Sequence, residues 1–193
     1  MTTSDPNAAN AKQEEPKDPA QIDYQQGVEF LSNHSYGQAA NAFHNALVGF
    51  ELNGNEEGIA NAKDKLGDVC LAQEEYTKAA SYYQEVFGIC KKFDDLMSLL
   101  ALRKKLVQCY RGLKDYDKAI EIYLEMLHFY EAMNNPGSTV ETMINIAETY
   151  EEKGDTANAA DAYETAAGIH ANFNHKLQAE KLLDKARELR EIQ

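Results

Sequence analysis

Residues 76–86 read YTKAASYYQEV, and the same skeleton returns at intervals of forty residues. The other copies are YGQAANAFHNA at 36–46, YDKAIEIYLEM at 116–126 and TANAADAYETA at 156–166. Within 76–86, the residues Tyr76, Ala79, Tyr83 and Val86 are spaced by three, four and three positions, which places them on one face of an α-helix. The chain therefore repeats one helical face four times.

A second helical face lies upstream of each copy. It carries a small or apolar residue and, three positions later, a larger one: Gly27 and Phe30, Gly67 and Cys70, Val107 and Tyr110, Ala147 and Tyr150. Turns rich in Asn, Asp, Gly and Pro follow at 53–55, 93–95, 134–136 and 172–174. These patterns predict an all-α fold of four antiparallel helix pairs: about 19–33 with 36–52, 56–72 with 76–92, 95–113 with 116–132, and 136–153 with 156–171.

Residues at the segment ends predict where helices begin and where the repeat stops. Asp18 before Pro19 is typical of a helix start. Good N-cap residues precede the second helix of three units: Ser35, Asp115 and Asp155. A ninth helix at about 175–191 carries Arg187 and Arg190 where earlier units carry small or apolar residues. A polar face suits a terminal helix that no further unit covers, so we expect a capping helix.

The chain divides by composition into a tail and one domain. Residues 1–18 contain almost no large apolar side chain, so they cannot bury enough surface to offset chain entropy, and we expect a disordered tail. Residues 19–193 are expected to form a single domain. Its parts are four repeats at about 19–55, 56–94, 95–135 and 136–174, and the capping helix at 175–191.

Charge and hydropathy exclude several classes of partner. The net charge is −13, which disfavours nucleic acids and anionic membrane surfaces and favours partners with basic patches. No run approaches the roughly 20 apolar residues that span a bilayer, so we expect no direct membrane insertion. The first residues lack the basic and apolar regions of a secretory signal, and we expect a cytoplasmic protein that is a monomer or a weak oligomer.

Residues that could carry chemistry do not form a set. The cysteines Cys70, Cys90 and Cys109 occupy apolar positions of the repeat, so we expect buried thiols in a reducing compartment. The histidines are scattered and form no metal-binding motif, and no phosphate-binding glycine loop or nucleophile–base set is present. We therefore expect no metal, no cofactor and no enzymatic activity.

The order of small, aromatic and Ala positions in residues 66–86 and 146–166 resembles the tetratricopeptide repeat (TPR). The resemblance covers about residues 20–172. It implies a superhelical solenoid whose first helices line a concave groove that holds a peptide or helix of a partner. Two departures stand out, because the usual unit has about 34 residues and these have forty, and the chain has no Trp. In length the units resemble those of kinesin light chains, Pins-type adaptors and SNAP proteins.

Sixteen residues of the first helices are expected to face this groove: Gln21, Tyr24, Val28 and Leu31; Asn61, Asp64, Asp68 and Leu71; Ala101, Lys104, Gln108 and Arg111; Glu141, Ile144, Glu148 and Glu151. One hypothesis is that Lys104 and Arg111 hold a carboxylate of the partner, while Asp64, Asp68 and Glu148 hold its basic residues. The alternative is a solvated face whose charges compensate one another. TPR domains that clamp a C-terminal carboxylate use Lys and Asn where this chain has Tyr24 and Val28, so the resemblance does not extend to that clamp.

Three functions fit these observations. The first is a protein-interaction scaffold that binds a peptide or helical segment in the groove. The second is a chaperone-like or regulatory module that masks a partner protein. The third is a structural scaffold that assembles end to end, although the arginines on the last helix oppose stacking at that end.

Overall fold

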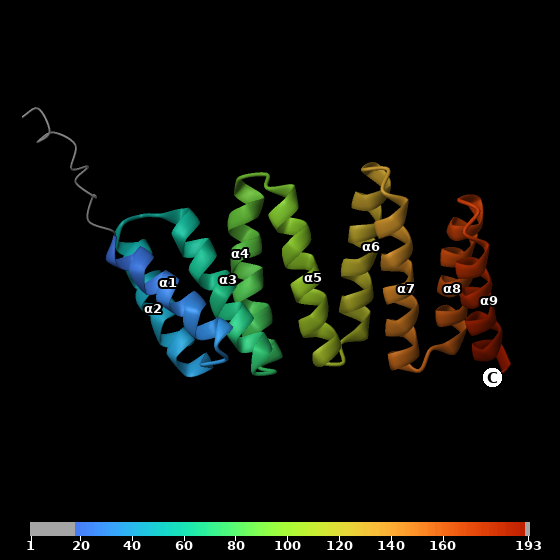
Figure 1. Cartoon of the computed structure of the whole chain (residues 1–193), viewed down its shortest axis with the longest axis horizontal. Coiled ribbons are helices and arrows are strands. Elements are labelled where there is room, and N and C mark those ends of the chain that lie inside the picture. The colour runs from blue at the N-terminus through green and yellow to red at the C-terminus, as the bar shows by residue number, and fades with distance from the viewer. Residues whose placement is uncertain (1–17, 192–193) are drawn as a thin grey trace, which may run out of the picture. The chain divides into compact units, whose positions relative to one another are not determined.

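The computed structural model describes residues 18–191, and all regular structure in that range is helical (Figure 1). The helices are α1 Pro19–Ser32, α2 Tyr36–Leu52, α3 Glu56–Ala72, α4 Tyr76–Lys92, α5 Leu96–Gly112, α6 Tyr116–Ala132, α7 Pro136–Lys153, α8 Thr156–Asn172 and α9 Lys176–Glu191. The all-α repeat fold is confirmed, and each expected helix end lies within one residue of its position. The expected tail falls outside the described residues except for Asp18, which is the N-cap of α1.

The described residues form two compact units, and the boundary between residues 62 and 63 falls inside α3. Unit 1 contains α1, α2 and the beginning of α3. Unit 2 contains the rest of α3 and α4 to α9. The single domain expected from the sequence stays a prediction.

A residue in the left-handed conformation stands in every turn between helices. These residues follow one another at intervals of twenty: His34, Gly54, Glu74, Asp94, Lys114, Asn134, Gly154 and Asn174. In each turn the next residue donates its backbone N–H back to the helix, as Glu75 does to the carbonyl of Cys70 over 2.8 Å. This is the bond pattern of a Schellman C-cap. Most helices consequently have 17 residues, joined by turns of three.

Side-chain caps fix several of the helix starts. Asp18 accepts from the backbone N–H of Ala20 over 3.0 Å, and Asp155 accepts from that of Asn158 over 3.2 Å. Asp115 caps α6 in the same way. Ser35 was also expected to cap, and this was wrong, because its side chain makes no cap hydrogen bond. The preceding turn's backbone hydrogen bonds hold that helix start without it.

The core of unit 1 depends on small residues that let aromatic rings approach the backbone. A Cβ on Gly27 would lie 2.7 Å from the Phe43 ring, so only glycine fits there. Tyr24 packs its ring against Phe43 and Phe50, with centroid distances of 5.6 and 6.4 Å. The expected contact between the small position of one helix and the aromatic position of the next is thus confirmed in this unit.

Unit 2 uses the same joint. Tyr83 is fully buried and would lie 2.5 Å from a Cβ added to Gly67. Each helix from α4 to α9 packs against the next in the chain. At the end, α9 buries Ala186 and Leu189 while Arg187 is exposed, which agrees with a capping helix.

The three thiols differ in burial. Cys70 and Cys109 are buried as expected, but Cys90 is only half-buried. Burial raises the pKa of the Cys109 thiol to about 11, so this group is a poor nucleophile.

Length and hydropathy of the helices also bear on membranes. Among the described helices, none has both the length and the apolar character that crossing a bilayer requires.

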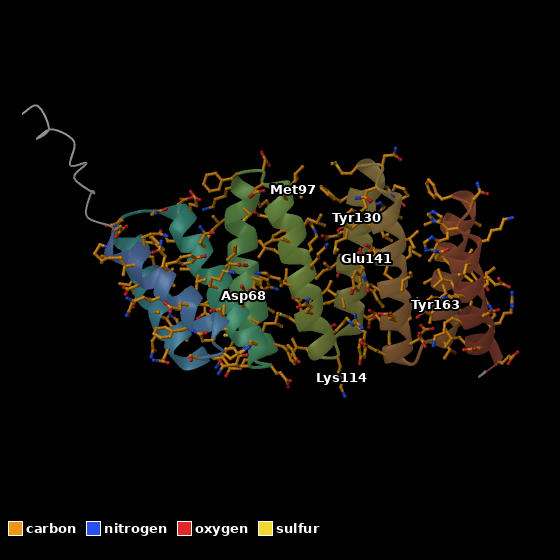
Figure 2. All side chains as sticks on the ribbon, in the orientation of Figure 1. Asp68, Met97, Lys114, Tyr130, Glu141 and Tyr163 are labelled. Carbon is orange, nitrogen blue, oxygen red and sulfur yellow. The ribbon has the colours of Figure 1, made fainter. Side chains whose placement is uncertain are left out.

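The left-handed turn residues generate a stability prediction. Lys114, whose side chain projects from a turn in Figure 2, has φ of 59°. Replacing it with Gly should raise the free energy of unfolding by about 0.5–1 kcal/mol, because glycine has no Cβ penalty in this conformation. Gly154→Ala should lower it by about 1 kcal/mol for the converse reason. Urea unfolding followed by circular dichroism measures both.

The matched control is Lys181→Gly, which places glycine in the middle of α9 at another exposed lysine. It should lower stability by about 1 kcal/mol. If Lys114→Gly destabilises the protein as much as Lys181→Gly does, the turn conformation does not control stability in this way.

Candidate functional site

In unit 2, the first helices of the repeats and the capping helix carry mostly polar residues at corresponding positions, forty residues apart. One position holds Lys65, Lys105, Asn145 and Lys185. Two others hold Asp64, Lys104, Ile144 and Asp184, and Asp68, Gln108, Glu148 and Glu188. Because adjacent first helices face each other, a lysine of one repeat can meet carboxylates of the repeat before it. We call each contact between neighbouring first helices a step. Unit 2 contains the steps from α3 to α5, from α5 to α7 and from α7 to α9.

At the step from α3 to α5, the chain's own charges meet. The Lys105 Nζ donates to both carboxylate oxygens of Asp64 and to Oδ1 of Asp68, each over 2.7 Å. Lys65 donates to the other oxygen of Asp68 over 2.8 Å. The Tyr83 hydroxyl donates to Asp68 over 2.9 Å, and Lys105 lies 5.1 Å from the centre of the Tyr83 ring. We call these five residues the Lys105 cluster.

Because Asp68 is half-buried, its ion pairs with the lysines change its pKa. Burial alone would raise the pKa of Asp68, yet hydrogen bonds from Lys105 and Lys65 hold it below its ordinary value. Burial and the neighbouring Asp68 carboxylate raise the pKa of Tyr83, so its hydroxyl remains a donor. The acceptor atoms of Asp64 and Asp68 are thus used within the chain, and we do not assign them to the basic residues of a partner.

Two further expected groove residues also have partners within unit 2. Arg111 makes a two-point ion pair with Glu152, and this pairing raises the pKa of its guanidinium further. Glu151 accepts from the Tyr163 hydroxyl over 2.7 Å and pairs with Lys185 over 3.0 Å. The step from α7 to α9 is therefore bridged by a lysine at the same recurring position as Lys105.

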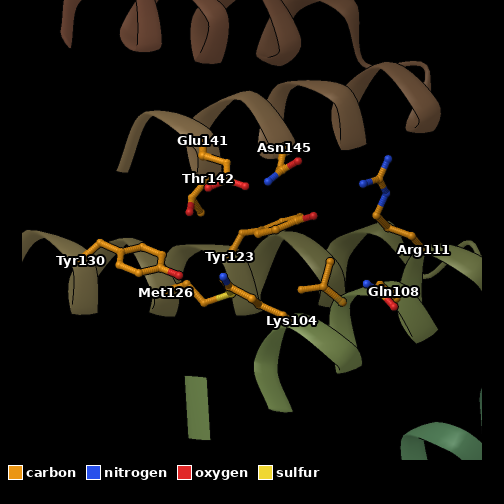
Figure 3. A pocket seen from close by; sticks show the side chains of 10 residues that line it. Lys104, Gln108, Arg111, Tyr123, Met126, Tyr130, Glu141, Thr142 and Asn145 are labelled. Carbon is orange, nitrogen blue, oxygen red and sulfur yellow. The ribbon is translucent and has the colours of Figure 1, made fainter. Parts of the chain in front are cut away.

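The step from α5 to α7 is different, because a cavity of about 230 Å³ opens there (Figure 3). Its lining residues are Lys104, Val107, Gln108, Arg111, Tyr123, Met126, Tyr130, Glu141, Thr142 and Asn145. Asn145 stands where the other steps have lysine, and Lys104 and Gln108 stand where α3 has its two aspartates. Lys104 and Gln108 are exposed, and Asn145 is half-exposed. We call this the α5–α7 pocket.

The α5–α7 pocket unites part of the predicted set with residues that the sequence did not single out. Lys104, Gln108, Arg111 and Glu141 were expected to face the groove, and they line the pocket. Tyr123 and Tyr130 of α6 and Asn145 of α7 also line the pocket, and none of them was expected to belong to a site. The interruption of the lysine series at residue 145 is the sequence signal that could have found Asn145.

The remaining predicted residues are distributed over both units. Tyr24 lines a cavity of about 190 Å³ in unit 1, together with Gln21 and Asn61. Val28 and Ala101 are exposed, whereas three other apolar members are half-buried: Leu31, Leu71 and Ile144. Glu148 is exposed on α7. In the described part of the chain, no three His, Cys, Asp or Glu side chains gather in a group that could hold a metal ion.

The Lys105 cluster predicts unequal roles for two adjacent lysines. Lys105→Met should lower the free energy of unfolding by about 2–3 kcal/mol, because it leaves half-buried carboxylates without their main cation. Lys104→Met should change it by no more than about 0.5 kcal/mol, since Lys104 is exposed. Urea unfolding at neutral pH measures both. Equal effects of the two changes would contradict the cluster.

The lowered pKa of Asp68 predicts a pH dependence. Its folded-state pKa lies below the unfolded value of about 3.9, so its contribution is present above that value and is lost as pH falls through the folded value. Asp68→Asn should therefore lower stability at pH 7 and weaken the loss of stability in acid. Urea unfolding between about pH 7 and pH 3 tests this.

The control for this titration is Glu121→Gln, which removes an exposed carboxylate of α6. Its unfolding profile should follow the wild type over the whole pH range. A wild-type slope in the Asp68→Asn protein would show that Asp68 does not contribute to the acid dependence.

Comparison with known families agrees with the repeat geometry. Two tetratricopeptide repeat models match the chain, one over residues 24–89 and the other over residues 96–172. No curated protein matches the sequence significantly. The fold of these repeats is typically a non-catalytic interaction scaffold.

Solved structures share the fold at low sequence identity. The TPR-like repeats of a putative kinesin light chain from Podosopora anserina align with a TM-score of 0.67 and 14 % identity, over 91 % of this chain and 97 % of that one. The apo form of RapI aligns with a TM-score of 0.75 and 14 % identity, over 90 % of this chain and 49 % of RapI. A Rap protein complexed with Competence and Sporulation Factor aligns with a TM-score of 0.58 and 17 % identity, over 89 % and 52 %. This chain thus spans about half the length of the Rap proteins, and it belongs to the tetratricopeptide repeat family.

Proposed function

We propose that this protein is a non-catalytic interaction module that binds a peptide or helical segment of a partner protein in the α5–α7 pocket. The observation that carries the proposal is that this step has no counterpart of the Lys105 cluster, although Arg111 and Glu152 pair across it. Where α3 and α5 are joined by Lys105 and two aspartates, α5 and α7 leave an open cavity with Lys104, Gln108 and Asn145 on its walls.

The polar groups of the pocket define the part of the partner that fits. The ammonium of Lys104 and the side-chain amides of Gln108 and Asn145 can all donate hydrogen bonds. No carboxylate of α5 stands beside them at the positions that correspond to Asp64 and Asp68. A carboxylate from a partner side chain would therefore supply the acceptor that the other step supplies itself.

The α7 wall of the pocket, which also carries Asn145, limits how acidic the partner segment can be. Glu141 lines the cavity near Thr142 and Tyr130, as Figure 3 shows. Its carboxylate would repel a second acidic group at that end. The partner segment should accordingly carry one carboxylate, with a neutral or basic neighbour on the Glu141 side.

The floor of the pocket offers apolar contact next to these polar groups. Tyr123, Met126 and Val107 are buried residues that line it. The cavity of about 230 Å³ is smaller than the roughly 300 Å³ or more that is typical of small-molecule sites, and it suits one or two side chains of a peptide. Aromatic and Met side chains are enriched at protein interfaces.

A structural neighbour supports partner binding by this kind of fold. One Rap protein of the same architecture was solved in complex with Competence and Sporulation Factor. At 17 % identity this likeness shows the fold only, so the class of ligand for the present chain rests on the α5–α7 pocket. Monomeric or weakly oligomeric state and cytoplasmic location remain part of the proposal.

Peptide selection tests the proposal without a known partner. Random peptides of about 12 residues displayed on phage are selected on the full chain, and the enriched peptides are synthesised for fluorescence anisotropy. We expect each to contain one Asp or Glu, and its amide analogue to bind at least about ten-fold more weakly. Lys104→Glu should weaken binding by a similar factor, because it places a carboxylate where the acceptor is expected.

Lys181→Glu is the matched control, because it makes the same charge change at an exposed lysine of α9, away from the pocket. It should leave affinity within about two-fold. The proposal is wrong if the selected peptides carry no acidic residue, or if Lys104→Glu and Lys181→Glu weaken binding equally.

A further inference from the structure

Unit 1 has a one-sided charge composition. The described residues 18–62 contain no Lys or Arg. They contain six carboxylates, which are Asp18, Asp23, Glu29, Glu51, Glu56 and Glu57. Within the described part of unit 1 there is consequently no lysine or arginine that can neutralise a carboxylate or cover an aromatic face.

In unit 2, carboxylates and aromatic rings lie beside lysines and arginines of the same unit. Its carboxylates pair with lysines and arginines, as in the Lys105 cluster and the pairing of Lys63 with Glu85. Three of its rings lie under cations, including Phe87 under Arg103 at 5.1 Å and Tyr110 under Lys118 at 5.3 Å. A lysine or arginine that pairs with a carboxylate of residues 18–62 therefore has to come from outside those residues.

Unit 1 also contains a cavity of about 190 Å³ that presents an aromatic wall. Its lining residues are Gln21, Tyr24, Phe50, Asn55, Glu57, Gly58 and Asn61. The Tyr24 ring is half-buried and held in place by its contacts with Phe43 and Phe50. Glu57, which is exposed, is the carboxylate among the lining residues. We call this the unit 1 pocket.

We propose that the unit 1 pocket binds an arginine side chain from a basic segment of a partner protein. A planar guanidinium can stack on the face of Tyr24 and at the same time donate two parallel hydrogen bonds to Glu57. The side-chain oxygens of Gln21 and Asn61 offer further acceptors, whereas Asn55 already accepts from the backbone N–H of Gly58 over 2.9 Å. The surrounding carboxylates attract the rest of the basic segment.

Arginine fits better than lysine for geometric reasons. An ammonium is a compact point charge that cannot make a two-point contact with Glu57 while it lies flat on a ring. The cavity has room for one large side chain rather than for a small-molecule ligand of ordinary size. The site is chemically opposite to the α5–α7 pocket, since it selects a cation where that pocket selects a carboxylate.

Fluorescence anisotropy with a synthetic probe tests this site on the full chain. The probe is a fluorescein-labelled peptide with two arginines separated by Ser and Gly, and its counterpart has lysines at the same places. At about 0.1 M salt we expect the arginine peptide to bind at least about five-fold more tightly than the lysine peptide. Glu57→Lys should weaken its binding by at least about ten-fold.

The matched control is Glu51→Lys, which makes the same charge change in unit 1 at an exposed residue that does not line the pocket. It should weaken binding by no more than about three-fold. If Glu57→Lys and Glu51→Lys weaken binding of the arginine peptide equally, general charge attraction explains the binding and the proposed site is wrong. Equal affinity for the lysine peptide would overturn the assignment to arginine.

Two more variants distinguish a partner arginine in the unit 1 pocket from binding elsewhere on the chain and from a lysine of the chain itself. Lys104→Glu should leave binding of the arginine peptide within about two-fold, so a failure of the α5–α7 pocket does not decide this test. The chain's own Lys12 and Lys17 are alternative occupants. If replacing both by Ala tightens the probe about ten-fold or more, the chain's own lysines fill the site, and the proposal of a partner arginine is overturned.

Discussion

The left-handed residue that recurs every twenty positions is the constraint on which the other features depend. At each turn the residue after it donates its backbone N–H to a carbonyl of the preceding helix, as Glu75 does to Cys70 and Asp115 to Tyr110. Because the left-handed residues are equally spaced, the helices follow one another without loss of phase, most with 17 residues and α7 with 18. Equivalent faces therefore return every forty residues, and a position in one repeat corresponds to a known position in the next.

This regularity makes departures from the repeat informative. The small and aromatic positions, such as Gly67 and Tyr83, are reused because every hairpin needs the same joint. The polar positions vary, and their variation decides whether a step between first helices is closed. Lys105 meets two aspartates across one step, whereas Asn145 stands at the corresponding position of the next step, where a cavity lies beside the pair of Arg111 and Glu152. The proposed site follows from an asparagine at residue 145, where residues 65, 105 and 185 are lysines, and not from an added loop or domain.

The sequence predicted the helices to within one residue, because apolar periodicity and turn residues both act locally. It led us to expect that one set of first-helix residues faces a groove, but it could not say which of their charges would be used within the chain. Lys104 and Lys105 are adjacent, and about 100° around the helix separates them, so only the packing of α5 shows that Lys105 reaches Asp64. The contribution of α6 to the pocket, through Tyr123, depends on the same tertiary arrangement.

The proposed pocket is tested most directly by building into it a counterpart of the Lys105–Asp68 ion pair, beside the existing pair of Arg111 and Glu152. Gln108→Asp together with Asn145→Lys reproduces there the residues that stand at 68 and 105 in the step before. We expect the double variant to fold as the wild type does and to lose at least about ten-fold in affinity for the selected acidic peptides, because the introduced carboxylate and ammonium would pair with each other. A double variant that folds normally and binds those peptides as tightly as the wild type would contradict the proposed pocket.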